Sequence, residues 1–169
     1  MADEAAYRVD MLLPKADYRQ WTVTVPWRIR FAMARDYRNI TAVLRIVMRC
    51  LFTYQRKMAR RVGHGEGKPA AVTFVHRAGR VLNSHPHLHS LLPDGVFVDK
   101  GGDVLRFVPL EPTPDDDIAG LVKRIAKRVT VWWDKQEGET DGFSDAINTH
   151  VWLATYVEFY KNRMMANLD

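Results

Sequence analysis

The chain has 169 residues, of which 47% are hydrophobic and 27% are charged, so it can bury a core and does not have the composition of a disordered tail. Its formal net charge of +5 fits a nucleic-acid partner but does not require one. A single cysteine, Cys50, excludes a disulfide framework, and the acidic start lacks the apolar run of a signal peptide. Because no stretch of about eighteen apolar residues occurs, we expect no membrane partner and a cytoplasmic, nucleoid-associated location.

The first third of the chain predicts one strand and two helices. Residues 20–26 alternate with a period of two and should form a strand that ends at Pro26. A short helix is expected at about 28–36. Apolar residues recur every three or four positions over 41–62, which predicts an amphipathic helix. Its other face is basic, a pattern typical of a solvated face or of a face that follows phosphates; it carries Arg45, Arg49, Arg56, Lys57, Arg60 and Arg61.

Short strands separated by turn signals dominate the middle of the chain, and their closeness in sequence suggests an antiparallel meander. They are expected at 71–76, 85–91, 96–98 and 104–108. A helix should begin after Thr113, because a capping threonine, a proline and acidic residues follow one another there. The last segment, about 148–165, is expected to be helical. The order of elements predicts an α+β fold with helices packed on an antiparallel sheet.

Three alternate histidines stand out in the run from Ser84 to Leu92. On an extended strand His85, His87 and His89 share one face, while Leu88 points the other way into the core. Neutral imidazoles two residues apart on a strand can chelate a divalent ion such as zinc, manganese, cobalt or nickel. An exposed sheet face with incidental histidines is the alternative reading.

Several collinear blocks around this strand resemble the rolling-circle insertion-sequence transposases, whose conserved block carries the histidine–hydrophobic–histidine signature of the HUH endonucleases. The resemblance is strongest in Ala71–Arg77, Leu82–Asn83, His85–His89, Leu92 and Asp94–Val98. Flanking segments from the start of the chain to Asp36, and from Leu105 to Pro114, are also similar, so the resemblance covers about residues 1–135.

The resemblance implies an HUH-endonuclease-like fold, related to ferredoxin and RNA-recognition-motif folds, that nicks and rejoins single-stranded DNA at transposon ends. In that family two histidines hold a divalent ion, Mg²⁺ or Mn²⁺, and a tyrosine becomes joined to the 5′ end of the cut strand. His87 and His89 match the two ligand positions. His85 is a ligand candidate by strand geometry alone, and His76 is a candidate for the third ligand because it lies on a neighbouring expected strand.

The family's nucleophiles lie after the histidines on a helix, often as two tyrosines one turn apart. Tyr156 and Tyr160 have this spacing and are the candidates here, although aromatic residues four apart on a helix are more often core packing. Tyr18, Tyr37 and Tyr54 precede the histidines and are poorer candidates.

The resemblance also divides the chain into a catalytic-domain core at 1–137 and a divergent C-terminal helical segment at 138–169. We expect the family's cysteine-rich N-terminal region to be missing. A homodimer is possible. Besides a nicking enzyme, the sequence allows a non-catalytic DNA-binding module or an inert relic. The DNA-contact candidates are Arg77, Arg80, Lys123 and Lys127.

Overall fold

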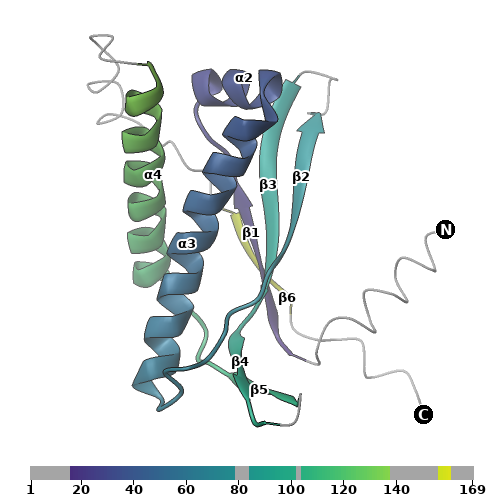
Figure 1. The fold of residues 1–169 in the computed structure, drawn as a ribbon, viewed down its shortest axis with the longest axis vertical. Coiled ribbons are helices and arrows are strands. Elements are labelled where there is room, and N and C mark those ends of the chain that lie inside the picture. The colour runs from purple at the N-terminus through teal and green to yellow at the C-terminus, as the bar shows by residue number, and fades with distance from the viewer. Residues whose placement is uncertain (1–15, 79–83, 102–103, 138–155, 161–169) are drawn as a thin grey trace, which may run out of the picture.

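A computed structural model describes residues 16–78, 84–101, 104–137 and 156–160, and this part of the chain has the expected α+β fold (Figure 1). The strands are β1 (Tyr18–Val23), β2 (Val72–Ala78), β3 (Ser84–Pro93), β4 (Gly95–Asp99), β5 (Leu105–Pro109) and β6 (Tyr156–Tyr160). The helices are α2 (Trp27–Arg35), α3 (Tyr37–Arg61) and α4 (Asp115–Glu137). No helix of this part is long and apolar enough to cross a membrane.

The main sheet has four strands in the order β2-β3-β1-β6, and every neighbouring pair is antiparallel. With α2 and α3 after β1, and α4 before β6, the chain follows the βαββαβ pattern of ferredoxin-like folds. Strands β4 and β5 form a separate two-stranded sheet inserted between β3 and α4. Of the expected antiparallel meander, the pairs β2–β3 and β4–β5 are present. The pairing of β3 with β4 is not, because β1 lies beside β3 instead.

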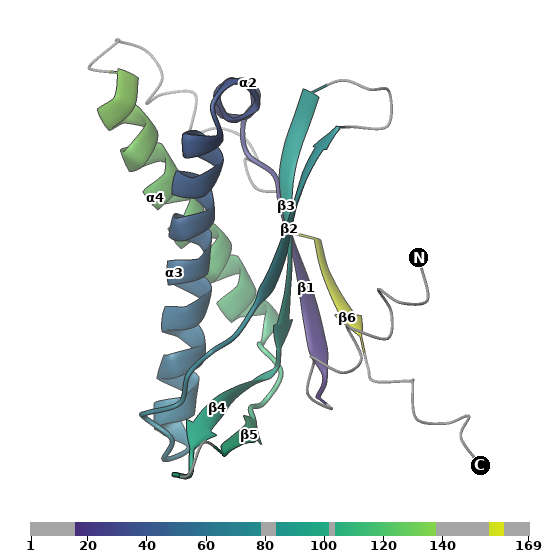
Figure 2. The ribbon, with the colours of Figure 1, turned by 45° about the vertical axis from the view of Figure 1, so that its right-hand side comes forward.

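The three helices that the structure describes lie on one side of the main sheet, and the described elements leave the other side open (Figure 2). The core fills the space between the sheet and the helices. Alternate residues of β1 and β3 point into it, so Val23 and Leu88 are almost fully buried against the apolar stripes of the helices. Those stripes include Val43, Val47, Cys50, Leu121 and Ile125.

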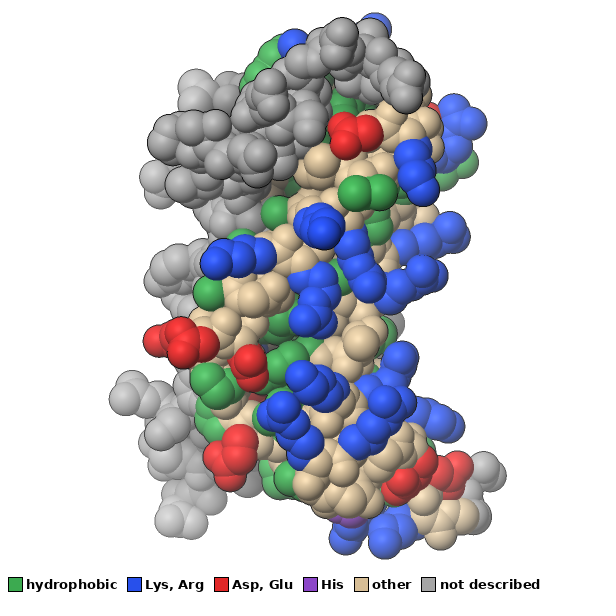
Figure 3. Space-filling view, turned by 90° about the vertical axis from the view of Figure 1, so that its left-hand side faces the viewer, with side chains coloured by type: hydrophobic (Ala, Val, Ile, Leu, Met, Phe, Trp, Pro, Cys, Tyr) green, Lys and Arg blue, Asp and Glu red, His purple; other side chains and the backbone are tan. Residues whose placement is uncertain are grey.

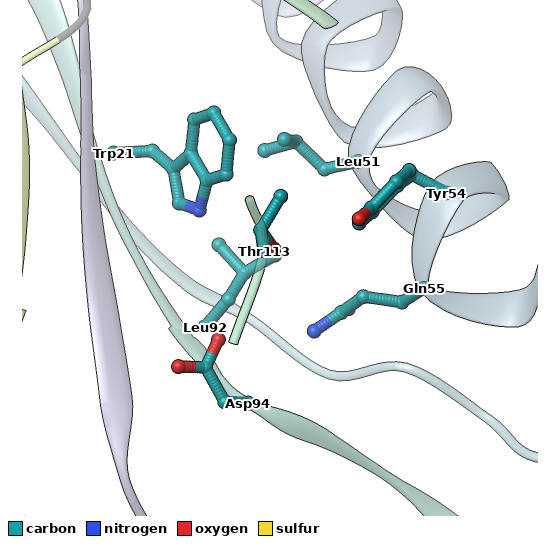
Figure 4. A pocket seen from close by; sticks show the side chains of 7 residues that line it. All are labelled: Trp21, Leu51, Tyr54, Gln55, Leu92, Asp94 and Thr113. Atoms are coloured by element: carbon teal, nitrogen blue, oxygen red, sulfur yellow. The ribbon is translucent and has the colours of Figure 1, made fainter. Parts of the chain in front are cut away.

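A buried polar cluster joins β1 to the last residue of β3 and the residue after it, and to the segment before α4. Arg19 is only 5% exposed; its Nη2 lies 3.5 Å from Oδ2 of Asp94, and its Nη1 donates to the Thr113 carbonyl at 3.1 Å. From α3, Gln55 Nε2 donates to the Pro93 carbonyl at 2.8 Å. Beside this cluster a small pocket is lined by Trp21, Leu51, Tyr54, Gln55, Leu92, Asp94 and Thr113 (Figure 4).

The prediction that the last segment is helical is wrong for Tyr156–Tyr160, which form strand β6 beside β1. A spacing of four puts two residues on one face in a helix and also in a strand, so the pattern did not discriminate between them. The remainder of 138–169 lies outside the described residues. The division of the chain at residue 137 stays a prediction, but β6 belongs to the same sheet as the core.

Candidate metal centre

Two adjacent strands bring three histidines together on the open face of the main sheet. His87 and His89 flank Leu88, which is 0% exposed, so their side chains lie on the side of β3 away from the helices. On β2, His76 is the direct register partner of His87, and partners in an antiparallel pair share a face. The structure thus places His76, a weaker candidate in the sequence, beside the two motif histidines.

The spacing of these side chains suits a divalent ion. One ring nitrogen from each of His76, His87 and His89 lies within 4.8 Å of the others, and the ring centroids are 4.4–5.2 Å apart. Imidazole nitrogens about 2.0–2.1 Å from a metal are about 3 Å from each other, so small side-chain rotations would close the site. Burial, and then the neighbouring imidazoles, lowers the pKa of His89, which favours the neutral form that binds metals.

Strand β1 supplies partners that orient His89. The Nδ1 atom of His89 lies 3.0 Å from Nε2 of Gln20 and 3.2 Å from Oγ1 of Thr22, which leaves the other ring nitrogen for the ligand site. Sequence reasoning missed both partners. Their signal was the alternation in β1, where the polar Gln20 and Thr22 alternate with the buried Trp21 and Val23.

The fourth histidine candidate, His85, stands at an irregularity in the strand. The β2–β3 register shifts between the pairs His76–His87 and Ala78–Ser84, so β3 has one more residue than β2 over this interval. Strict alternation, from which His85 was assigned, is interrupted at such a bulge. The side chain of His85 lies outside the described residues, and its role as a ligand stays a prediction.

The tyrosine candidates lie at the other edge of the same sheet. Across the β1–β6 pair Tyr156 is the register partner of Thr22, and Tyr160 is the partner of Tyr18. Thr22 is in turn the partner of His89, so Tyr156, Thr22 and His89 form one row across the sheet. Burial raises the pKa of Tyr18 to about 12, which makes that phenol a poor nucleophile.

Among the DNA-contact candidates that the structure describes, Arg77 is the one next in sequence to a histidine of the centre. It follows His76 on β2 and is exposed. Lys123 and Lys127 are exposed on α4, on the helical side of the sheet, so the structure does not bring them to the histidines. Figure 3 shows a broad basic surface on the side of the molecule where α3 and α4 lie. Arg80 lies outside the described residues.

Comparison with known proteins supports a transposase family for the histidine block, whereas the resemblance expected over residues 1–69 lies outside the match. Residues 70–163 match the model of a family described as "Putative transposase", so the similarity extends beyond residue 137, where it was expected to fade. No curated protein and no solved structure matches the chain. Since the family match spans more than half of the chain and contains all three histidines of the centre, this protein belongs to that transposase family.

Proposed function

We propose that this transposase nicks and rejoins single-stranded DNA through a tyrosine–5′-phosphate intermediate, with a divalent ion, Mg²⁺ or Mn²⁺, held by His76, His87 and His89. The observation that carries the proposal is the convergence of these three ring nitrogens on the open face of the sheet. Bound there, the ion would supply Lewis acidity to a non-bridging oxygen of the scissile phosphate. Burial lowers the pKa of His89, and Gln20 and Thr22 of β1 contact its Nδ1 atom; both features suit these residues to hold a metal ion.

The nucleophile proposed is Tyr156, with Tyr160 as the second tyrosine. The Cα atoms of Tyr156 and His89 are separated by two strand spacings, about 10 Å, which a tyrosine and a histidine can bridge with a phosphate between them. Tyr160 stands four residues, or about 13 Å, further along β6. The sheet register therefore favours Tyr156 for the first attack.

The chemistry is a transesterification that needs no other reactant. The Tyr156 oxygen attacks the phosphorus, the bond from phosphorus to the 3′ oxygen breaks, and the phenolic proton ends on that 3′ oxygen. The product is a tyrosine ester of the 5′ phosphate together with a free 3′ hydroxyl. Attack by a 3′ hydroxyl on this ester reverses the step and joins strands.

The test uses the full chain, a random-sequence pool of single-stranded DNA labelled at the 3′ end, and added Mn²⁺ or Mg²⁺. A labelled adduct should migrate with the protein on a denaturing gel, because the 3′ fragment carries the 5′ phosphate. His87→Ala/His89→Ala should reduce the adduct by at least about 100-fold. Tyr156→Phe should abolish it, whereas Tyr37→Phe, a control at an exposed position on α3, should leave it unchanged.

A non-catalytic DNA-binding module is the second candidate, and the basic surface of α3 and α4 favours it. Helix α3 contains no acidic residue, and its outward face and that of α4 gather lysines and arginines (Figure 3). If the folded protein binds metal and forms no adduct, while binding single strands in a salt-dependent way, the nicking proposal fails and this candidate replaces it. An adduct that persists in the double histidine variant would also contradict the proposed centre.

A further inference from the structure

Helix α2 exposes two aromatic side chains where a surface helix normally presents polar residues. Trp27 is 64% exposed and Phe31 is 56% exposed. They are four residues apart and therefore lie on the same side of the helix, while Ile29 and Met33 on the opposite side are 1% exposed and belong to the core. We call the outward row of Trp27 and Phe31 the α2 aromatic row.

Arginines lie against both rings of this row. The Arg28 guanidinium carbon is 5.6 Å from the Trp27 ring centroid, and that of Arg35 is 5.0 Å from the Phe31 centroid. Helix α2 has no acidic residue in its first turn, where Arg28 and Arg30 stand. Basic residues at the positive end of a helix dipole oppose its stability, so helix formation does not account for this composition.

The row and the histidine centre lie on opposite sides of the main sheet (Figure 2). Helix α2 contacts β3 at the end of the sheet where that strand begins (Figures 1 and 2). His87 is three residues beyond Ser84, the first residue of β3, a distance of about 10 Å along the strand. Because α2 lies on the helical side of the sheet and the histidines lie on its open face, a nucleic-acid strand that reached both would pass around this end of the sheet (Figure 2).

We infer that the α2 aromatic row is a stacking platform for unpaired bases of single-stranded nucleic acid, with Arg28 and Arg35 placed to contact the phosphates beside them. Aromatic faces that alternate with basic side chains are the usual means of holding single strands without sequence preference, because every base has a flat face to stack. That the nucleic acid is DNA at the site of nicking rests on the proposed function. Stacking itself does not depend on the metal or on a tyrosine.

The test measures binding of the full chain to a fluorescent oligothymidylate of about fifteen nucleotides by anisotropy, with a chelator present. Trp27→Ala and Phe31→Ala should each weaken the affinity by about 5- to 150-fold, the range found when one stacked base is lost. Phe31→Tyr should restore the affinity. Leu105→Ala, a control at a 58% exposed position on β5, should leave it unchanged.

Salt dependence separates stacking from charge. The two alanine variants should keep the wild-type slope of log affinity against log salt. Arg35→Gln should reduce the size of that slope by about one, the value expected when one phosphate contact is lost. Duplex DNA should compete poorly, since its bases are already stacked. Thermal melts that match the wild type would show that the variants fold.

Three results would overturn the inference: unchanged affinity in the folded alanine variants, equal competition by duplex, or a dimer that becomes a monomer in these variants while its DNA affinity is retained. The last would make the row an interface with a second copy. Because binding is measured without metal, it is independent of adduct formation. If the histidine variants lose the adduct but bind oligothymidylate normally, the defect lies in the metal centre, and the stacking inference is unaffected.

Discussion

The contacts between His89 and strand β1 lead to a prediction about metal affinity that does not depend on catalysis. If Nε2 of His89 binds the ion, the proton of the neutral imidazole must sit on Nδ1. The Nδ1–H group can then donate a hydrogen bond to Thr22 Oγ1, 3.2 Å away. It can also donate to the side-chain oxygen of Gln20 once that amide, whose Nε2 lies 3.0 Å away, is turned over. Replacing these two partners should therefore weaken metal binding while all three histidines remain.

The size of the effect follows from the bonds lost. A neutral hydrogen bond contributes about 0.5–1.5 kcal/mol, so Gln20→Leu combined with Thr22→Val should cost about 1–3 kcal/mol of metal binding. This corresponds to a dissociation constant raised by roughly 5- to 150-fold, which includes the roughly 10- to 100-fold range usual for the partners of metal-bound histidines. Each single variant should show about half of this free-energy change.

Cobalt(II) absorption titration of the metal-free protein measures the dissociation constant directly, and calorimetry with Mn²⁺ provides an independent value. Thr24→Val, the next outward position after Thr22 along the same segment, is the matched control and should not change it. A change of less than about threefold in the folded double variant would refute the role of these partners. Equal weakening in Thr24→Val would refute it as well.

Three further predictions concern stability. Leu88→Ala should lower the free energy of unfolding by about 2–5 kcal/mol, because the side chain is 0% exposed, and denaturant melts would show whether the cost is instead below about 1 kcal/mol. Tyr54→Phe should cost about 1–3 kcal/mol, since its hydroxyl donates to Asp117 Oδ2 at 2.8 Å; a double-mutant cycle with Asp117→Asn should give non-additive losses, and full additivity would contradict the bond. Burial raises the pKa of Asp94 above its ordinary 3.8, so the folded state binds the proton more tightly and stability falls as pH rises through that range. Melts of Asp94→Asn against pH should show a shallower fall than the wild type, and an identical slope would exclude Asp94 as its source.

Local patterns predicted most of the individual elements. The expected helix at 41–62 is α3, and the expected strand at 85–91 lies within β3, because apolar periodicity reports directly which residues face a core. The same alternation assigned His87 and His89 to one face, opposite Leu88, as the structure shows. It failed where regularity breaks: the register shift near His85 cannot be read from an alternating sequence.

The sequence by itself determined most of the elements, but not strand β6. It also determined that the motif histidines share one face of a strand and that α3 is basic on its outer side. Only the tertiary structure decided that β1 lies between β3 and β6, and that His76, Gln20 and Thr22 meet at His87 and His89. Partners far apart in sequence are selected by the joint burial of the sheet's apolar face against the helices. No local period contains that information, because it depends on how all the apolar faces pack at once.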